Sequence, residues 1–321
     1  QPRAIAHPKQ TEKLRGEAWL SLQYHEIKGQ FADGSPYRLQ RPEYQLTQLA
    51  YGELEDYIGL SPRLAPNVFG MGLLDAIGEA DLLAQEDPDD HDGNGVSGRY
   101  NRVPNVLTGE LQVGRFGFKA KQPNLAQQVA AAFRDDIGIT NSLFSEESCT
   151  DAQFNCAKAA TLGGAASVEI PQKLLTLVDQ FSLLLAVPPA RELDNLDPQA
   201  GRSLFHQLGC ADCHTPGYTT AKDYPVRALA NQKIWPYTDL ALHDMGELLA
   251  DGVSEFDASG KEWRTPPLWG IGLQQAYTGH QAFLHDGRAR TIEEAILWHG
   301  GEAHSARQKY LVLDKTQRQQ V

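Results

Sequence analysis

The sequence predicts a mainly α-helical protein with one small β hairpin. Apolar residues recur at intervals of three and four in the stretches that begin at Asn124 and at Pro171, which is typical of amphipathic helices. Helix-start signals precede further stretches in the C-terminal half. Residues 19–46 instead show strand-like alternation around a turn sequence.

The N-terminal region, residues 1–190, is expected to be irregular and mostly helical apart from this hairpin. "LSLQY" alternates apolar with polar side chains, and Asp33-Gly34 supplies a turn before "YRLQRPEYQL". A weaker helical pattern follows in "NVFGMGLLDAIGEADLLA", where three glycines oppose helix formation. The next helix begins after Asn124 as N-cap and stops at Gly138. Another begins at Pro171 and ends before Pro188-Pro189.

A second domain is expected over residues 191–321, after the linker "VPPARELDNLDP". Its first helix, "AGRSLFHQLG", has Asp197 as N-cap and Pro198 at the first helical position. Later, Thr291 opens "TIEEAILWHG" with Glu294 three residues on, which predicts a capping box. An amphipathic stretch closes the chain.

Charge and hydropathy exclude two classes of function. The 321 residues carry 29 Lys plus Arg against 41 Asp plus Glu, a formal charge of -12. A surface of that sign repels phosphate backbones, so nucleic acid is excluded as a partner, and basic redox proteins or cations are favoured. No apolar run approaches the roughly 20 residues of a transmembrane helix.

Two of the four cysteines lie three residues apart in "LGCADCHTPGY", and His214 follows the second directly. Cys-x-x-Cys-His is the attachment pattern of c-type haem, because two thiols must reach the two vinyl groups of one porphyrin with an imidazole under the iron. A zinc site would need two more ligands, and a redox pair would lie at a helix start. The motif therefore predicts covalent haem on Cys210 and Cys213, with His214 as an axial ligand; a zinc site or a bare turn is the alternative.

The helix before the motif carries Gly201 and Phe205, four residues apart. This pair resembles the pattern in cytochrome c domains, where that helix crosses the C-terminal helix, so residues 191–321 are expected to be cytochrome-c-like. Covalent haem attachment implies a periplasmic or equivalent compartment, where disulfides are permitted. Cys149 and Cys156 are therefore expected to pair, with two free buried thiols as the alternative.

Five segments of the sequence carry a family resemblance: "HDGNGVSGRYN", "VGRFGFKAKQPNLAQQVAAAF", "WPYTDLALHDMGE", "EWRTPPLWGIG" and "FLHDGRARTIEEAILWHGGEA". They resemble the bacterial di-haem oxidoreductase family, also labelled thiol oxidoreductases, which is similar to di-haem cytochrome c peroxidases and to the methylamine dehydrogenase maturation enzyme. The resemblance extends from about Gly16 onward. It implies a peroxidase-like periplasmic enzyme of a Gram-negative bacterium that exchanges electrons with a redox partner protein.

One departure from the family concerns the number of haem motifs. The family carries two, a peroxidatic one followed by an electron-transfer one, whereas this chain contains only the second. We expect either a truncated chain, whose full-length protein holds a second haem and a possible N-terminal membrane association, or a single-haem relative. The alternative function is accordingly a simple electron carrier, and no catalytic residue is named.

The second axial ligand decides whether the haem site is closed for electron transfer or open for peroxide chemistry. In the related peroxidases the distal ligand follows the histidine of the His-Asp-Gly element by fourteen residues, and counting from His285 reaches His299. The resemblance thus predicts ligation by His214 and His299. Met245 is the rival, an open site is a further alternative, and a simple helix C-cap is the other reading of His299. The other candidates are His206, His243, His280, His285 and Met71.

The resemblance also implies that three further side chains lie against the haem. His285 belongs to the His-Asp-Gly turn, and Arg264 or Arg288 would pair with a propionate through a bidentate contact. An exposed arginine without a partner is the alternative for either position.

A separate cation site is predicted in "DPDDHDGNGVSGRYN". Asp90, Asp92, Asn94 and the Val96 carbonyl take positions 1, 3, 5 and 7 of an EF-hand-type calcium loop. Asn101 stands at position 12 in place of the bidentate Glu, so a calcium ion here would be structural. The alternative is a solvated acidic turn.

Overall fold

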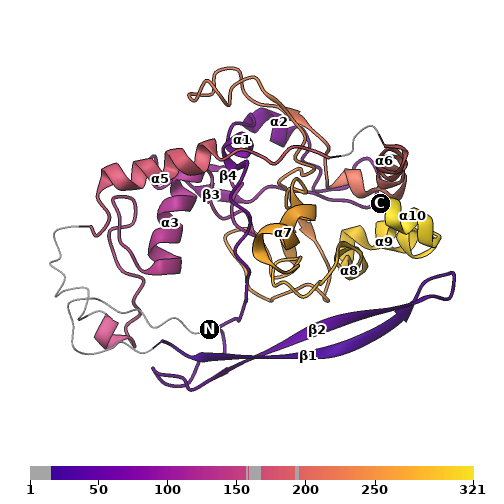
Figure 1. The fold of residues 1–321 in the computed structure, drawn as a ribbon. Coiled ribbons are helices and arrows are strands. Elements are labelled where there is room, and N and C mark those ends of the chain that lie inside the picture. The colour runs from indigo at the N-terminus through magenta and orange to yellow at the C-terminus, as the bar shows by residue number, and fades with distance from the viewer. Residues whose placement is uncertain (1–15, 157, 159–167, 192–194) are drawn as a thin grey trace.

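The computed structural model describes residues 16–156, 158, 168–191 and 195–321 (Figure 1). The described residues are 30% helix and 16% strand, so the prediction of a mainly α-helical protein is wrong, and the expected cytochrome-c-like character of the C-terminal part is not confirmed. Strands in the described residues form four separate two-stranded sheets. Long extended segments between them are held by side chains: the Asn101 amide, for example, donates to the carbonyls of Lys119 and Glu255. Such contacts leave no periodic signal in the sequence.

The predicted hairpin is confirmed and is long. Strand β1 (Trp19–Gln30) pairs antiparallel with β2 (Pro36–Thr47), with Ile27 opposite Leu39. Asp33 and Gly34 lie in the turn, and Gly34 adopts a φ of 82°, which glycine tolerates without a Cβ clash. Alternation therefore located both the strands and the turn.

The turn of the hairpin is anchored on the C-terminal end of the described chain. Arg318 donates to the Asp33 carboxylate at 3.0 Å, and its guanidinium lies 3.8 Å from the ring centroid of Phe31. Figure 1 shows the turn beside helix α10 (Lys315–Gln320). The first and last elements of the fold are thus packed together.

The helices of the N-terminal half are short or confined by glycine. The weak pattern near Met71 forms two helices instead of one, because Gly78 is extended between them. Asn124 caps its helix by accepting from the Gln127 amide, and Gly138 ends it with a φ of 68°, as predicted. The elements are α1 (Met71–Asp75), α2 (Glu79–Leu83), β3 (Arg102–Pro104), β4 (Leu111–Val113), α3 (Leu125–Ile137) and α5 (Gln172–Leu184).

The C-terminal half combines short sheets with helices. Its first helix is preceded by Asn195, two residues before the predicted cap. Thr291 accepts from the Glu294 amide, but the Glu294 carboxylate binds the Arg290 amide, so only half of the predicted capping box forms. No helix in the described ranges is long and apolar enough to span a membrane. The elements are α6 (Leu196–Leu208), β5 (Tyr218–Thr219), β6 (Lys233–Ile234), β7 (Leu242–Asp244), β8 (Glu262–Arg264), α7 (Gln274–Thr278), α8 (Ile292–Trp298), α9 (His304–Leu311) and α10.

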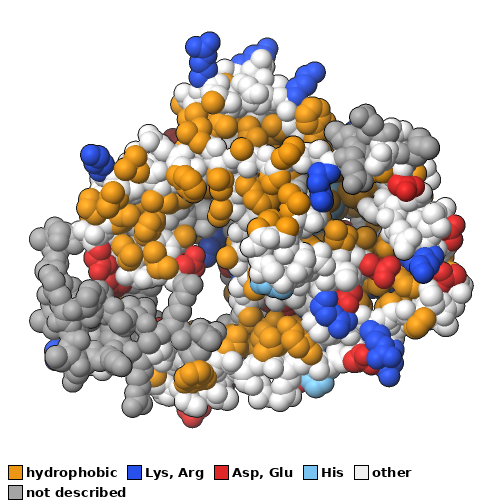
Figure 2. Space-filling view, viewed as in Figure 1, with side chains coloured by type: hydrophobic (Ala, Val, Ile, Leu, Met, Phe, Trp, Pro, Cys, Tyr) orange, Lys and Arg blue, Asp and Glu red, His pale blue; other side chains and the backbone are white. Residues whose placement is uncertain are grey.

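Four hydrophobic clusters form the core of the described residues, and the two largest each draw on both halves of the chain. The first packs α1, α2 and α3 against Ile234 and Leu240. The second packs Phe31 and Leu39 of the hairpin against Trp298 and other C-terminal side chains. The division at residues 190 and 191 stays a prediction. Outside the clusters, apolar side chains gather on the surface over α5 (Figure 2).

Helix α6 crosses α10 at a glycine. A Cβ added to Gly201 would lie 1.8 Å from the Gln320 carbonyl oxygen. Gly201→Ala is therefore expected to lower the free energy of unfolding by about 1–3 kcal/mol through overpacking, despite the better helix propensity of alanine. Denaturant unfolding checks this against Ser203→Ala on the exposed side of α6. Equal free energies of unfolding for the two variants would show that α6 and α10 move apart at little cost and accommodate the added methyl group.

Candidate functional site

The haem motif lies in a tight turn directly after α6. Gly209 ends the helix with a φ of 87°, and Cys210–Asp212 continues as one turn of 3-10 helix. The His214 amide donates to the Cys210 carbonyl at 2.9 Å and closes this turn. Both thiols are free and half-buried, so two sulfur atoms and an imidazole project from one short segment.

The thiols are held in their protonated form. Burial raises the pKa of Cys210 to about 11 and also raises the pKa of Cys213. Among the described residues, the side chains close enough to share a metal ion are Asp87, Asp90 and Asp92, and neither thiol belongs to this group. Zinc needs several deprotonated ligands together, so the geometry does not favour the zinc alternative.

His214 is oriented by a backbone carbonyl. Its Nδ1 lies 2.9 Å from the Tyr237 carbonyl oxygen, and because a carbonyl only accepts, Nδ1 carries the proton. Burial lowers the pKa of His214 to about 4, against the opposing effect of the Tyr237 carbonyl. The neutral ring therefore keeps a free lone pair on Nε2. Tyr237 has a φ of 53°, a strained conformation of the kind that accumulates at functional sites.

His299 repeats this arrangement from another element. It ends α8, and its Nδ1 donates to the Ala295 carbonyl at 2.7 Å, which again leaves Nε2 free. Burial lowers the pKa of His299, and its charge in turn contributes to lowering the pKa of His214. Both readings of His299, helix cap and ligand, agree with this position.

Among the rivals, His243 has no free ring nitrogen. Its Nε2 lies 2.8 Å from the Asp239 carboxylate and its Nδ1 lies 2.8 Å from that of Glu302. Met245 packs against the second hydrophobic cluster and keeps its place as a rival. Of the other candidates, His206 and His280 are exposed, and Met71 packs on the first cluster.

His285 is engaged by aromatic stacking. Its ring lies 3.7 Å from the Trp263 centroid with an interplanar angle of 10°. Burial lowers its pKa to about 4, so the ring is neutral at neutral pH. Lys119, whose side chain is fully buried, lies 4.1 Å from the Trp263 centroid. This buried cation was not predicted, since nothing near it in the sequence distinguishes it from a surface lysine.

The two predicted arginines differ in their partners. Arg288 is bound to the Asp286 carboxylate through Nε and Nη2 and to the Leu248 carbonyl, so its donors are largely used. Arg264 is buried, and the hydrogen bonds of its guanidinium go to the carbonyls of Gly117 and Thr265. Burial lowers the pKa of Arg264 to about 10. In the described part of the chain no carboxylate forms an ion pair with it, so Arg264 retains capacity for an anion.

These residues fit a haem. The motif offers two thiols within one turn, and His214 and His299 offer two free Nε2 atoms for an iron. Arg264 offers its guanidinium, and the fully buried Trp298 has an indole N–H without a partner among the described residues. Cationic and N–H donors of this kind suit the propionates of a porphyrin.

The sequence did not identify two candidate functional residues, Asp239 and Glu302. Asp239 stands four residues before His243, a spacing visible in "WPYTDLALHDMGE", but no local pattern connects Glu302 with either. The pairing depends on tertiary structure, because 59 residues separate His243 from Glu302.

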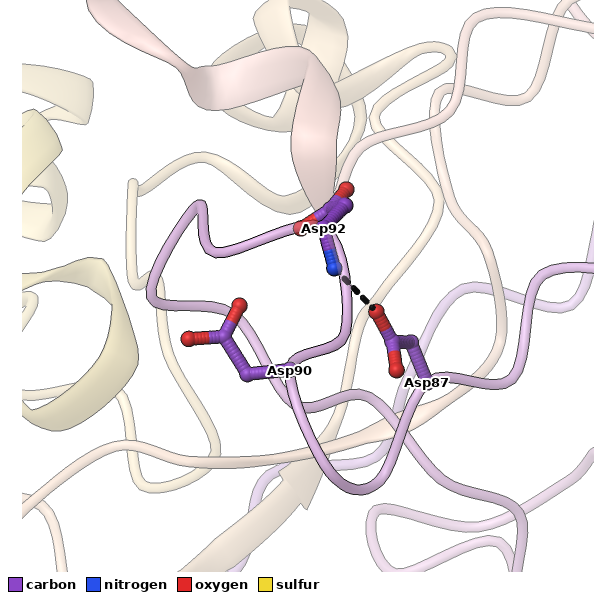
Figure 3. A group of neighbouring side chains, drawn as sticks. All are labelled: Asp87, Asp90 and Asp92. Atoms are coloured by element: carbon purple, nitrogen blue, oxygen red, sulfur yellow. Dashed lines mark hydrogen bonds between the residues drawn. The ribbon is translucent and has the colours of Figure 1, made fainter.

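The acidic loop places Asp90 and Asp92 close to each other and to Asp87 (Figure 3), and the calcium site stays a prediction. One carboxylate oxygen of each lies within 4.8 Å of the others. Asn94 differs from the prediction, because its side-chain oxygen accepts from the Val96 amide at 2.7 Å and its amide donates to Asp92. The Asp92 amide donates to Asp87 at 3.3 Å, the bond drawn in Figure 3.

The remaining cysteines are joined to each other. Cys149 and Cys156 form a disulfide with their Cα atoms 5.8 Å apart. The free thiols of the chain are therefore those of the haem motif, Cys210 and Cys213.

Comparison with known proteins gives one extended match. A family model described as "Di-haem oxidoreductase, putative peroxidase" matches residues 6–321. No curated protein matches the chain. A structure of hydrazine synthase from Kuenenia stuttgartiensis, pressurised with 20 bar xenon, is similar at 16% identity and a TM-score of 0.27, over 81% of this chain and 96% of that one.

Proposed function

Because the chain belongs to the di-haem oxidoreductase family, we propose that it transfers electrons through a c-type haem attached to Cys210 and Cys213. His214 and His299 hold the iron in this proposal. The observation that carries it is the matched anchoring of both rings, each through Nδ1 to a backbone carbonyl. Metal-binding histidines are commonly oriented in this way by the hydrogen bond of the other ring nitrogen.

The chain's own residues have distinct roles around the group. When bound, the haem supplies one-electron redox chemistry. The thiols would tether it, and Arg264 and the Trp298 indole would bind its propionates. Phe205 and Tyr237 are in edge contact, with centroids 5.7 Å apart, and Phe205 lies 6.2 Å from the His214 ring. These aromatic rings shield the proximal imidazole from water.

The proposed reaction is peroxide reduction. Reduction of one peroxide molecule consumes two electrons and two protons and yields two water molecules, so a one-electron site acts twice in each turnover. The site of Cys210, Cys213 and His214 would serve as the entry point for electrons from a redox partner protein, and the second haem of the di-haem family would be the peroxidatic one. The charge of -12 favours a basic partner.

A periplasmic location accompanies this proposal. Covalent haem attachment takes place in that compartment, and the Cys149–Cys156 disulfide is compatible with its oxidising conditions. The second candidate function is a single-haem electron carrier, and the presence of one Cys-x-x-Cys-His motif in the 321 residues favours it.

One experiment separates these functions. Protein produced with a c-type cytochrome maturation system is assayed for haem per chain by pyridine haemochrome and for peroxide consumption with a reduced electron donor. Peroxide turnover supports the enzyme. Haem that is reduced and reoxidised without peroxide turnover supports the carrier, and absence of covalent haem contradicts both.

We further propose that the acidic loop binds a structural calcium ion through Asp87, Asp90 and Asp92. Three carboxylates in close approach match the oxygen ligands that calcium prefers. Calcium at a hundredfold excess over its Kd should stabilise the protein by about 2.7 kcal/mol, measured as a higher Tm. Asp90→Asn should abolish the effect, whereas Asp56→Asn, outside the loop, should keep it. An unchanged Tm and metal content after chelation would show that the loop is a solvated turn.

A further inference from the structure

Three charged side chains form a buried cluster behind the haem motif. In this histidine–carboxylate cluster, His243 lies between Asp239 and Glu302, with both nitrogen-to-oxygen distances at 2.8 Å. His243 is 2% exposed and Asp239 is 4% exposed. The proposed ligands do not include these residues, and their charges are shielded from solvent.

The hydrogen bonds determine the charge of His243. An ionised carboxylate only accepts, so two carboxylate partners require a proton on both ring nitrogens, which makes the ring an imidazolium. Glu302 is held ionised because it also accepts from the Ser97 and Asp244 amides. The pKa of His243 is raised well above its usual value by its partners, chiefly Asp239, although burial alone would lower it. The cluster therefore carries one positive and two negative charges.

The cluster contacts the haem motif at two points. His243 Nδ1 lies 3.6 Å from the Cys213 sulfur, and the Asp239 amide donates to the Cys213 carbonyl at 3.0 Å. Asp239 and His243 also influence the protonation of the His214 ring with opposite signs. The packing is tight, because a Cβ added to Gly98 would lie 2.7 Å from His243 Cε1. The charges are thus fixed beside Cys213, whose sulfur is the proposed attachment point.

We infer that the histidine–carboxylate cluster sets the reduction potential of the haem attached at Cys213. This inference rests on the proposed function. One electron passes from a reduced donor to ferric iron, giving ferrous iron and the oxidised donor, so the site loses one positive charge. A nearby cation favours that change and a nearby anion opposes it, and burial protects both effects from screening by salt.

Variants that remove one charge each test the inference by the sign of their effects. His243→Gln removes a cation and should lower the midpoint potential, whereas Glu302→Gln removes an anion and should raise it. The expected size is about tenfold in the equilibrium constant for reduction, equivalent to 59 mV for one electron. The matched control is Glu247→Gln, whose carboxylate is 77% exposed and whose potential should stay unchanged.

The measurement is a spectroelectrochemical titration at about pH 6, below the usual pKa of histidine, so that the imidazolium persists in Glu302→Gln. Asp239→Asn, which should also raise the potential, replaces His243→Gln if the latter does not fold. A purely structural cluster would lower Tm in every variant without opposite shifts in potential. Haem per chain is measured first: wild type without covalent haem contradicts the proposed function. Haem-loaded variants overturn the inference alone if their potentials are unshifted, if His243→Gln and Glu302→Gln shift the potential in the same direction, or if Asp239→Asn lowers it.

Discussion

Replacing His299 with alanine is expected to open one coordination position of the haem iron and to convert the ferric protein from low spin to high spin. The free Nε2 of His299 is the one group proposed to close that position. The variant should bind cyanide or added imidazole readily, and the wild type should bind them poorly. Absorption and electron paramagnetic resonance spectra of the ferric protein measure the change.

The control for this prediction is Met245→Leu, which keeps a similar volume in the second hydrophobic cluster. Its spectrum should match that of the wild type. A weak long-wavelength sulfur-to-iron band in the wild type, lost in Met245→Leu, would assign the ligand to Met245 instead. Low-spin iron in His299→Ala with no such band would also contradict ligation by His299.

Replacing both Cys210 and Cys213 with alanine is expected to abolish covalent haem. The two thiols are the only free cysteines of the chain, because Cys149 and Cys156 are bonded to each other. Haem stain on a denaturing gel should fall from about one haem per chain to background. The double variant should also unfold at lower temperature, since a ligand bound only by the folded state stabilises it.

The matched control is Cys149→Ala with Cys156→Ala. It removes the same number of sulfur atoms from a surface loop, so the protein should lose stability through the missing disulfide and keep its haem stain. Covalent haem that survives in the Cys210 and Cys213 variant would place the attachment elsewhere.

Elements with strong local signals were predicted well. Alternation in "LSLQY" and the Asp33-Gly34 turn located the hairpin, and Asn124 and Gly138 marked both ends of α3. Each signal acts within a few residues of the element that it specifies, through a cap, a turn or a repeated apolar position.

The fold class was wrong because its determinants are not local. Arg115 shows the reason: its guanidinium donates to the carbonyls of Leu74, Asp75 and Ile77, some forty residues earlier, and thereby satisfies the end of α1. Extended segments held in this way have neither helical nor strand periodicity. Their conformation depends on distant partners, which single-sequence patterns do not reveal.

The residues of the candidate site also differ in whether a local sequence signal identifies them. Cys210, Cys213 and His214 follow from chemistry that demands a fixed spacing, and His299 follows from counting along a family motif. The contribution of His243 follows only from the fold, because Glu302 reaches it across 59 residues. The sequence does not distinguish Arg264 from Arg288 as a propionate partner, whereas the fold does, because Arg288 forms an ion pair with Asp286.

Mass mapping of proteolytic peptides from the purified protein tests the central claim most directly. The account predicts that the peptide containing Cys210, Cys213 and His214 carries the added mass of one haem through two thioether bonds. Recovery of that peptide with both thiols free, from protein produced with a working cytochrome c maturation system, would contradict it.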